Sequence, residues 1–261
     1  MLLAVDIGNT NIVLGIHNGE SWINHWRICT DPTKMPDEYG VLLRDLLRQE
    51  DIHNTEIKQS VISSVVPGLT PKIRDMIQKL FSFEALIVGP GVKTGLKILI
   101  ENPAELGTDI VCNSVAAYNR IGGSCIVVDF GTALTFTAIR EPGEILGVSI
   151  APGLQAAAEA LSEHTAQLPQ VWLEPPKTTI GTNTNKSIQS GVIFGYTGLV
   201  EALIDRMKEE LGGQVSVIGT GGRSGVIAPL TDRFTLIEPW LILEGLRLIA
   251  SRNTRFFENQ A

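Results

Sequence analysis

The sequence is poor in cysteine, in histidine and in basic side chains. Its 261 residues include three cysteines, Cys29, Cys112 and Cys125, none close to another, so neither a disulfide framework nor a cysteine zinc site is expected. The four histidines are scattered, which argues against a histidine metal cluster. The 21 Lys and Arg are outnumbered by 28 Asp and Glu, for a formal net charge of -7. This acidic excess opposes binding to nucleic acid or to an anionic membrane.

The sequence also has little that would direct it into a membrane. It begins with Met1 and reaches the acidic Asp6 with no basic leader, so no signal peptide is expected. The charge-free stretch at residues 145–158 contains Pro152 and is shorter than the roughly 20 apolar residues of a membrane helix. With 44% hydrophobic residues, the chain can build one large core or two modest ones. We therefore expect a cytoplasmic globular protein.

An apolar run that ends in Asp-x-Gly occurs twice. Residues 2–10 read LLAVDIGNT, and residues 125–132 read CIVVDFGT. Each run is followed by a second apolar segment, at residues 11–17 and 134–139, and then by residues typical of turns. The repeat predicts that a β-meander opens each of two similar domains.

Helical patterns alternate with further strands in both halves. Apolar residues recur at helical spacing within residues 39–47 and 199–211, and a helix is expected to begin at Thr70-Pro71, with Thr70 as its cap. Buried strands are expected at 60–65 and 215–218, and a last helix near Pro239. This order predicts an α/β protein with a first domain at 1–118 and a second at 119–261.

The two Asp-x-Gly turns have the chemistry of phosphate-binding loops. Glycine lets backbone N–H groups approach an anion closely, and Thr10 and Thr132 add hydroxyl donors. Because carboxylates repel phosphates, Asp6 and Asp129 make sense beside a nucleotide if a cation lies between them. A single such turn would be interpreted as a hairpin closure. Two copies, expected to face each other across a cleft, favour nucleotide binding, although a purely structural duplication stays open.

Other nucleotide and hydrolase signatures fail on spacing. Residues 89–94, GPGVKT, lack the first and last glycines of a P-loop, and residues 219–224 end in Ser224 where a dinucleotide motif has glycine. Residues 147–151 lack the second glycine of a nucleophile elbow. Asp109 precedes a helical pattern that is expected to start around Thr108. Two interpretations of Asp109 stay open: a favourable charge at a helix start, and a general base for phosphate transfer.

The ordered motifs resemble those of type III pantothenate kinases, within the superfamily of actin, sugar kinases and Hsp70. The first turn is similar to the family's first phosphate motif, residues 107–109 (GTD) to its catalytic aspartate motif, and residues 129–135 to its second phosphate motif. Shorter segments such as 63–67, 102–103 and 220–222 agree. The resemblance implies two actin-like, or ribonuclease H-like, domains, each with a mixed sheet flanked by helices. It also implies that the chain transfers the γ-phosphate of ATP to the primary hydroxyl of pantothenate, the first step of coenzyme A biosynthesis.

The resemblance assigns roles to individual residues. Asp109 would be the general base, Asp6 would bind Mg²⁺, and Asp129 would bind a monovalent cation, K⁺ or NH₄⁺. The residues implied to bind ATP are Asp6, Ile7, Gly8, Asn9, Thr10, Asn11, Ile12, Val13, Gly131 and Thr132. Those implied to bind pantothenate are Gly107, Thr108, Asp109, Ile110 and Thr184. Family members are homodimers with a shared active site, which implies that Thr184 serves the neighbouring subunit.

Two positions depart from the family pattern. Ile110 follows the catalytic aspartate, where the family usually has arginine, and Ile100 stands where it usually has tyrosine. Both replacements remove polar groups expected to meet the acceptor. Two alternatives therefore accompany the kinase hypothesis: a non-catalytic, nucleotide-binding regulatory paralogue, and a kinase for another small hydroxyl compound.

Overall fold

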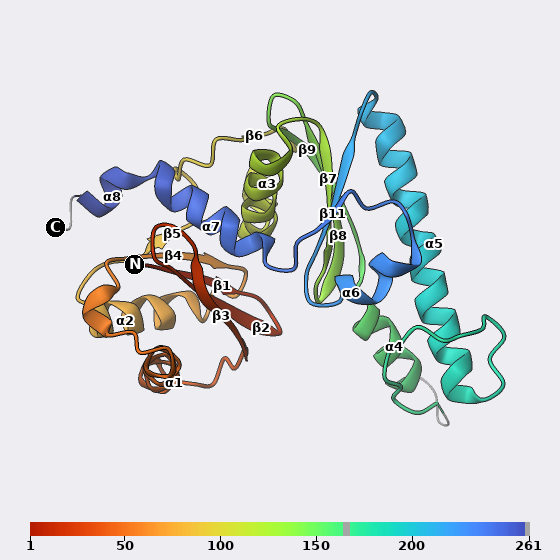
Figure 1. Ribbon diagram of the computed structural model, residues 1–261, viewed down its shortest axis with the longest axis horizontal. Helices are drawn as coiled ribbons and strands as arrows, with labels where there is room; N and C mark the ends of the chain where they lie inside the picture. The colour runs from red at the N-terminus through yellow and green to blue at the C-terminus, as the bar shows by residue number, and fades with distance from the viewer. Residues whose placement is uncertain (164–167, 259–261) are drawn as a thin grey trace. The chain divides into compact units, whose positions relative to one another are not determined.

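A computed structural model of the protein describes residues 1–163 and 168–258 (Figure 1). It contains two mixed sheets. The five strands of the first sheet are β1 (Leu2–Ile7), β2 (Asn11–His17), β3 (Trp22–Cys29), β4 (Gln59–Ser64) and β5 (Leu86–Ile87). The six strands of the second are β6 (Lys97–Ile98), β7 (Cys125–Phe130), β8 (Ala133–Arg140), β9 (Glu144–Pro152), β10 (Ser216–Thr220) and β11 (Leu236–Ile237).

The two sheets repeat one topology. The first has the strand order β3-β2-β1-β4-β5, and the second contains the corresponding order β9-β8-β7-β10-β11, with β6 added beside β9. In each, an antiparallel meander is followed by two parallel strands. The predicted pair of meanders is therefore confirmed, and the sequence repeat has a structural counterpart.

Helices of its own half of the chain cover one face of the first sheet, and Leu243 of the C-terminal helix α7 (Leu241–Arg252) packs against Gly15 of β2. The helices of its own half are α1 (Pro36–Gln49) and α2 (Thr70–Phe81), which lie side by side (Figure 1). Tyr39, Leu43 and Met76 from these helices pack in one core with Val5 and Leu14 of the sheet. All six residues of β1 are buried, as expected for a central strand with both faces covered.

The second sheet packs against α4 (Leu154–Glu163) and α5 (Thr184–Leu211), with the short α6 (Ser224–Ile227). Phe130 and Phe136 are fully enclosed in this core beside Ile193 and Ile204 of α5. Among the described residues, α5 is the one helix long and apolar enough to cross a membrane by length and composition, a test that core helices of water-soluble proteins also pass. Of its most apolar stretch, 39% is buried within the protein.

The remaining long helices are α3 (Thr108–Ile121) and α7 (Leu241–Arg252), and α8 (Thr254–Glu258) follows α7. Three 3₁₀ turns complete the elements: Asn54–Glu56, Pro103–Glu105 and Ala228–Leu230. The predicted helices at 39–47 and near 108, and the predicted strand at 60–65, are confirmed to within a few residues. The predicted cap at Thr70 is wrong: Leu69 precedes the helix, and the Thr70 hydroxyl instead donates to Ser64 Oγ at 2.7 Å.

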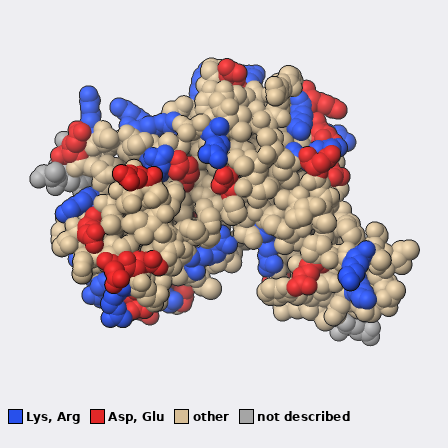
Figure 2. Space-filling view, viewed as in Figure 1, with Lys and Arg blue, Asp and Glu red and all other residues tan. Residues whose placement is uncertain are grey.

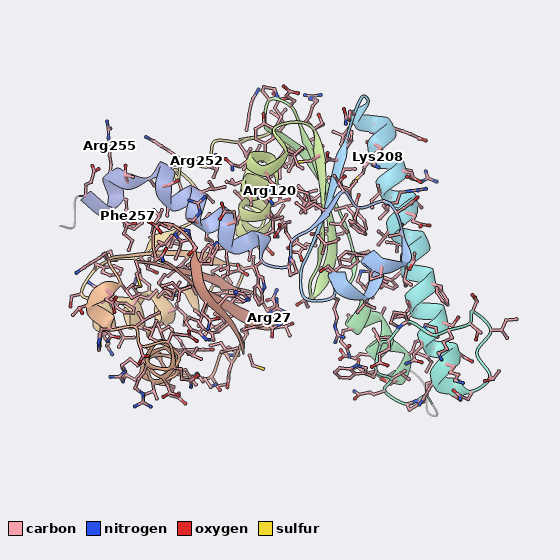
Figure 3. All side chains as sticks on the ribbon, in the orientation of Figure 1. Arg27, Arg120, Lys208, Arg252, Arg255 and Phe257 are labelled. Atoms are coloured by element: carbon pink, nitrogen blue, oxygen red, sulfur yellow. The ribbon has the colours of Figure 1, made fainter. Side chains whose placement is uncertain are left out.

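The chain forms two compact units. The first contains Met1–Gly95, Asn102–Ala116 and Ile242–Ala261, and the second contains Leu96–Glu101 and Ala117–Leu241. The C-terminal helices belong to the first unit because they hold the loop before β6. Asn253 exchanges two hydrogen bonds with the backbone of Lys93, at 3.0 and 3.1 Å, and Arg252, labelled in Figure 3, donates to the carbonyl of Thr94. These units differ from a single cut near residue 118, which would leave residues 242–261 in the second half.

Charged side chains of both signs are interspersed on the face in Figure 2, and basic side chains do not gather there over one element. Several form ion pairs at the surface, for example Arg48 with Asp45 at 2.6 Å and Lys79 with Asp37 at 3.2 Å. Because such exposed pairs are screened by water, each contributes little to the free energy of folding.

Candidate functional site

The first Asp-x-Gly turn joins β1 to β2 and is held by Thr30. Within the turn, Gly8 N–H donates to the carbonyl of Asn11 at 3.0 Å. The Thr30 hydroxyl donates to the carbonyl of Gly8 at 2.6 Å, and its N–H donates to the carbonyl of Thr10 at 3.0 Å. Both carbonyls are thereby directed toward Thr30, which fixes the orientation of the turn's peptide groups. Sequence reasoning did not identify Thr30, because its two partners lie about 20 residues earlier in the chain.

The side chains of the first turn fall into two groups. Asn9 and Thr10 are exposed, whereas Ile7, Ile12 and Val13 are buried. Buried apolar side chains can offer a ligand only their backbone, so the predicted ATP-binding role of these three residues is restricted to peptide groups.

Asp6 lies near the end of β1, in the middle of the first sheet, and its carboxylate is nearly buried. It pairs with Val13 of β2 and with Ser63 of β4, and 8% of its surface is exposed. A buried carboxylate needs a partner of opposite charge or several donors. One carboxylate beside a glycine turn of this kind also suits Mg²⁺, which is commonly held by one or two carboxylates together with substrate phosphates.

Helix α3 begins at Thr108, whose hydroxyl is attached to the end of β4. Thr108 Oγ1 donates to the carbonyl of Ser64 at 3.1 Å, accepts from Ser64 N–H at 3.0 Å, and lies 3.0 Å from Ser63 Oγ. A hydroxyl has one proton and two lone pairs, so these contacts use all of its hydrogen-bonding capacity. Ser63 and Ser64 pair with Asp6 and Ile7 of β1, so the helix start is attached directly beside the first turn.

Asp109 follows in the first turn of α3 and is partly buried. Its Oδ1 accepts from Ile110 N–H at 2.8 Å. Burial raises the pKa of the carboxyl above its ordinary value, while hydrogen bonds from the backbone N–H groups of Ile110 and Asp109 oppose this shift. A raised pKa makes the carboxylate a stronger base near neutral pH. Gly107 lies so close that a Cβ on it would collide with Asp109 Oδ1, which explains why glycine stands there.

Cys112 lies one turn further along α3. Its thiol is fully buried, and that burial raises its pKa well above the ordinary value. The negative charge of Asp6 raises the pKa further, a hydrogen bond with Ser63 opposes the shift, and Asp109 adds to it. Asp6 pairs with Ser63 of β4, whose Oγ lies 3.0 Å from Thr108 Oγ1, and Asp109 directly follows Thr108, so the two carboxylates lie in the same neighbourhood of the first unit. Sequence reasoning treated Cys112 only as a reduced cysteine and missed this position.

The second Asp-x-Gly turn joins β7 to β8 and is enclosed by glycines. Gly131 N–H donates to the carbonyl of Ala133 at 3.1 Å. Gly153 lies against the carbonyls of Gly131 and Thr132 so closely that no Cβ would fit, and its N–H donates to Thr132 O at 3.2 Å. Gly221, with a φ of +87°, lies against the carboxylate of Asp129 in the same way. The segment 220–222, which resembles the family pattern, therefore lies beside the second turn. Thr220 at the end of β10 pairs with Asp129 of β7, and Gly221 follows it.

Two further predicted residues, Thr132 and Thr184, lie in the second unit. Thr132 is exposed in the second turn, and Thr184 is exposed as the first residue of α5, after the helix cap Asn183. Across residues 1–163 and 168–258, no three side chains of His, Cys, Asp and Glu gather to hold a metal ion by themselves. Any metal near Asp6 or Asp129 would therefore need ligands from a bound substrate, the backbone or water.

Comparisons with known proteins agree on one family. The family model described as type III pantothenate kinase matches residues 2–206. The type III pantothenate kinase of Moorella thermoacetica is 48% identical over 97% of this chain and all of its own length, and that of Geotalea uraniireducens is 44% identical over 97% of this chain and 99% of its own.

Solved structures share the fold at low sequence identity. A Campylobacter jejuni protein assigned to the Baf family of transcriptional activators aligns with a TM-score of 0.62 at 19% identity, over 97% of this chain and 99% of its own. A Sinorhizobium meliloti protein assigned as a 2-dehydro-3-deoxygalactonokinase also has a TM-score of 0.62, at 13% identity and 96% coverage of both chains. The predicted actin-like fold class is confirmed by these neighbours and by the two mixed sheets. On its sequence and its fold, the chain belongs to the type III pantothenate kinase family.

Proposed function

We propose that this chain is a pantothenate kinase that transfers the γ-phosphoryl group of ATP to the primary hydroxyl of pantothenate. Membership of the family supports the reaction. The observation within the molecule that carries the proposal is the neighbourhood of Asp6 and Asp109, joined through the hydrogen bonds of Thr108 to Ser63 and Ser64 of β4. Phosphoryl transfer to an alcohol needs a carboxylate to position a cation and a second group to accept a proton, and these two carboxylates fit those needs.

Asp109 acts as the general base in this proposal. As the hydroxyl oxygen forms its bond to the γ-phosphorus, the bond from that phosphorus to the β-γ bridging oxygen breaks and ADP leaves. The proton of the hydroxyl passes to the Asp109 carboxylate. Burial raises the pKa of that carboxyl, which improves it as a proton acceptor.

The first turn binds the triphosphate through the exposed side chains of Asn9 and Thr10 and through its backbone N–H groups. Asp6 holds Mg²⁺, which would neutralise charge on the phosphates during transfer. Gly107, Thr108, Asp109 and Ile110 line the pocket for pantothenate.

The second unit supplies further ligands. We propose that Gly131 and Thr132 bind ATP as well, and that Asp129 holds a monovalent cation, K⁺ or NH₄⁺. Asp129 is partly exposed beside the second turn, and Gly221 packs directly against its carboxylate. We further propose a cytoplasmic homodimer in which Thr184 contacts pantothenate bound to the neighbouring subunit.

A coupled assay tests the reaction. Purified protein is given ATP, Mg²⁺ and K⁺, and ADP release is measured with and without pantothenate. We expect ADP release that depends on pantothenate and product with one added phosphate by mass spectrometry. ADP release that pantothenate does not change would contradict the proposed function.

One observation favours a second candidate, a nucleotide-binding protein without pantothenate kinase activity. The partly buried Ile110 and Ile100 place apolar side chains where the family pattern has polar ones, and loss of a charged hydrogen-bond partner costs about 1.5–3 kcal/mol. Calorimetry separates the candidates, because this alternative predicts heat on adding ATP but none on adding pantothenate. A screen of hydroxylated metabolites for stimulated ATP consumption would reveal a kinase for another acceptor.

A further inference from the structure

The start of α3 poses a question about Thr108. It stands in the segment proposed to line the pantothenate pocket, yet its hydroxyl is occupied by the protein itself. It donates to Ser64 O at 3.1 Å and accepts from Ser64 N–H at 3.0 Å. With its one proton given to Ser64, the contact of 3.0 Å to Ser63 Oγ leaves Ser63 as the donor. No hydrogen-bonding capacity remains for a substrate.

The two partners of the Thr108 hydroxyl, Ser63 and Ser64, lie beside the first Asp-x-Gly turn. Ser63 pairs with Asp6, and Ser64 pairs with Ile7 at the edge of the first turn. On the helix side, Thr108 is directly followed by Asp109. Three hydrogen bonds of a single hydroxyl therefore join the residue before the proposed base to the strand beside the proposed Mg²⁺ ligand.

Neighbouring contacts support the same arrangement. Cys112 lies one helical turn after Thr108 with its thiol beside Ser63, so α3 meets β4 at two successive points on one side. Both Ser63 and Cys112 are fully buried. Hydrogen bonds shielded from water are costly to break without replacement, so this attachment resists movement of the helix start.

We propose that Thr108 is a positioning residue that sets the distance between Asp109 and Asp6, by means of the Thr108 network formed with Ser63 and Ser64. This inference rests on the proposed function for its effect on turnover, but the network itself is a property of the first unit. Phosphoryl transfer depends on placement, and a displacement of about 1 Å in a reacting group can cost on the order of 100-fold in rate. Loss of the hydroxyl is therefore expected to reduce kcat far more than ATP binding.

The experiment compares two substitutions at Thr108. Thr108→Val keeps the shape and removes the hydroxyl, whereas Thr108→Ser keeps the hydroxyl. We expect Thr108→Val to lower kcat about 10- to 100-fold, with a dissociation constant for ATP within about threefold of wild type by calorimetry. Thr108→Ser should recover most of the lost rate. Ser63→Ala, which removes one of the three contacts, should fall between the two.

A matched control separates positioning from general destabilisation. Thr197 is buried, and its hydroxyl donates within its own helix, to Ile193 O at 2.9 Å. Thr197→Val is expected to leave kcat unchanged. The proposal is contradicted if Thr108→Val turns over at the wild-type rate, or if Thr108→Ser loses as much rate as Thr108→Val.

A second measurement does not depend on turnover. Ser64 N–H donates to Thr108 Oγ1, so its hydrogen exchange, followed by NMR, should be at least about tenfold faster in Thr108→Val than in wild type. Unchanged exchange would overturn the network whatever the enzyme does. A wild-type protein without pantothenate-dependent turnover, but with accelerated exchange in Thr108→Val, would refute the proposed function and leave the network standing.

Discussion

The two Asp-x-Gly turns have nearly the same sequence but are supported in different ways. The first is held by hydrogen bonds from a threonine, Thr30, and its Asp6 is almost entirely buried. The second is enclosed by Gly153 and Gly221, and its Asp129 is partly exposed. The first turn also has a second carboxylate, Asp109, in its neighbourhood, because Thr108 is hydrogen-bonded to Ser63 and Ser64 beside β1. A duplicated motif therefore appears here in two environments, and we assign the chemistry to the first and ligand support to the second.

The largest expected effect is at the first turn. Asp109→Asn should lower kcat about 10²- to 10⁴-fold, because an amide cannot accept the proton of the acceptor hydroxyl. Its affinity for ATP should be nearly that of wild type. Steady-state kinetics and calorimetry check both values, and a full wild-type rate would remove Asp109 from the mechanism.

Stability provides the control for this variant. The folded-state pKa of Asp109 is raised by burial, so its ionised form at neutral pH favours the unfolded chain, and this cost disappears as pH falls below the ordinary pKa of a carboxyl. Asn keeps an oxygen that can accept from Ile110 N–H. Asp109→Asn should therefore raise the melting temperature at pH 7 by a few degrees, on the order of 2–4 °C. A lower melting temperature would mean that its loss of rate reflects damage to the fold.

The next largest effect is expected from a substitution that disrupts the close packing of Gly221 against the second turn. In Gly221→Ala the new Cβ would collide with Asp129 Oδ1 and lie 2.8 Å from the backbone of Phe130, at a φ of +87°. We expect destabilisation by about 2–4 kcal/mol and ATP affinity weakened at least about tenfold, measured by denaturant unfolding and calorimetry.

Gly225→Ala is the matched control, because a Cβ there would meet nothing within 4 Å. It lies in α6 and should be neutral or slightly stabilising, by up to about 1 kcal/mol. If both alanine variants behave alike, close packing against Asp129 does not support the second turn.

A smaller effect tests the charge of the second turn. Asp129→Asn should reduce turnover about 5- to 20-fold and abolish its dependence on K⁺, since a neutral amide holds a monovalent cation less well than a carboxylate. Rates are compared in KCl and in a salt of a large organic cation at equal ionic strength. A variant that responds to K⁺ like wild type would place the cation elsewhere.

The smallest effect removes the hydroxyl that supports the first turn. Thr30→Val breaks the bond to Gly8 O but keeps the backbone bond to Thr10 O, so we expect ATP affinity to weaken about 3- to 10-fold, equivalent to about 0.7–1.4 kcal/mol. The kcat at saturating ATP should change little, and Thr30→Ser should retain most of the affinity. If Thr30→Val lowers kcat and leaves ATP affinity intact, Thr30 does not act through the phosphates.

The sequence predicted the meanders and the helix start at residue 108 because these depend on local patterns. It located only the C-terminal part of α5. Residues 187–200 contain Gly191, Gly195 and Gly198 and mix polar and apolar residues without a clear helical spacing, so they have neither good helix propensity nor a single apolar stripe. The structure begins this helix at Thr184, after the cap Asn183.

The residues that hold the site in place could not be predicted from local patterns. Asp6, Asp109 and Asp129 were identified because they stand in short motifs, whereas Thr30 and Ser63 act on backbone or side chains 20 to 45 residues away. The placement of α7 and α8 in the first unit depends on long-range contacts such as Asn253 with Lys93. A single sequence does not reveal such pairs, because either partner alone fits many environments.

The most direct test of the central claim is a crystal structure with a non-hydrolysable ATP analogue, Mg²⁺ and pantothenate. The account predicts the primary hydroxyl of pantothenate within about 2.6–3.2 Å of the Asp109 carboxylate, with Asp6 beside the metal. A hydroxyl that contacts a different base, with Asp109 directed away from it, would contradict the account.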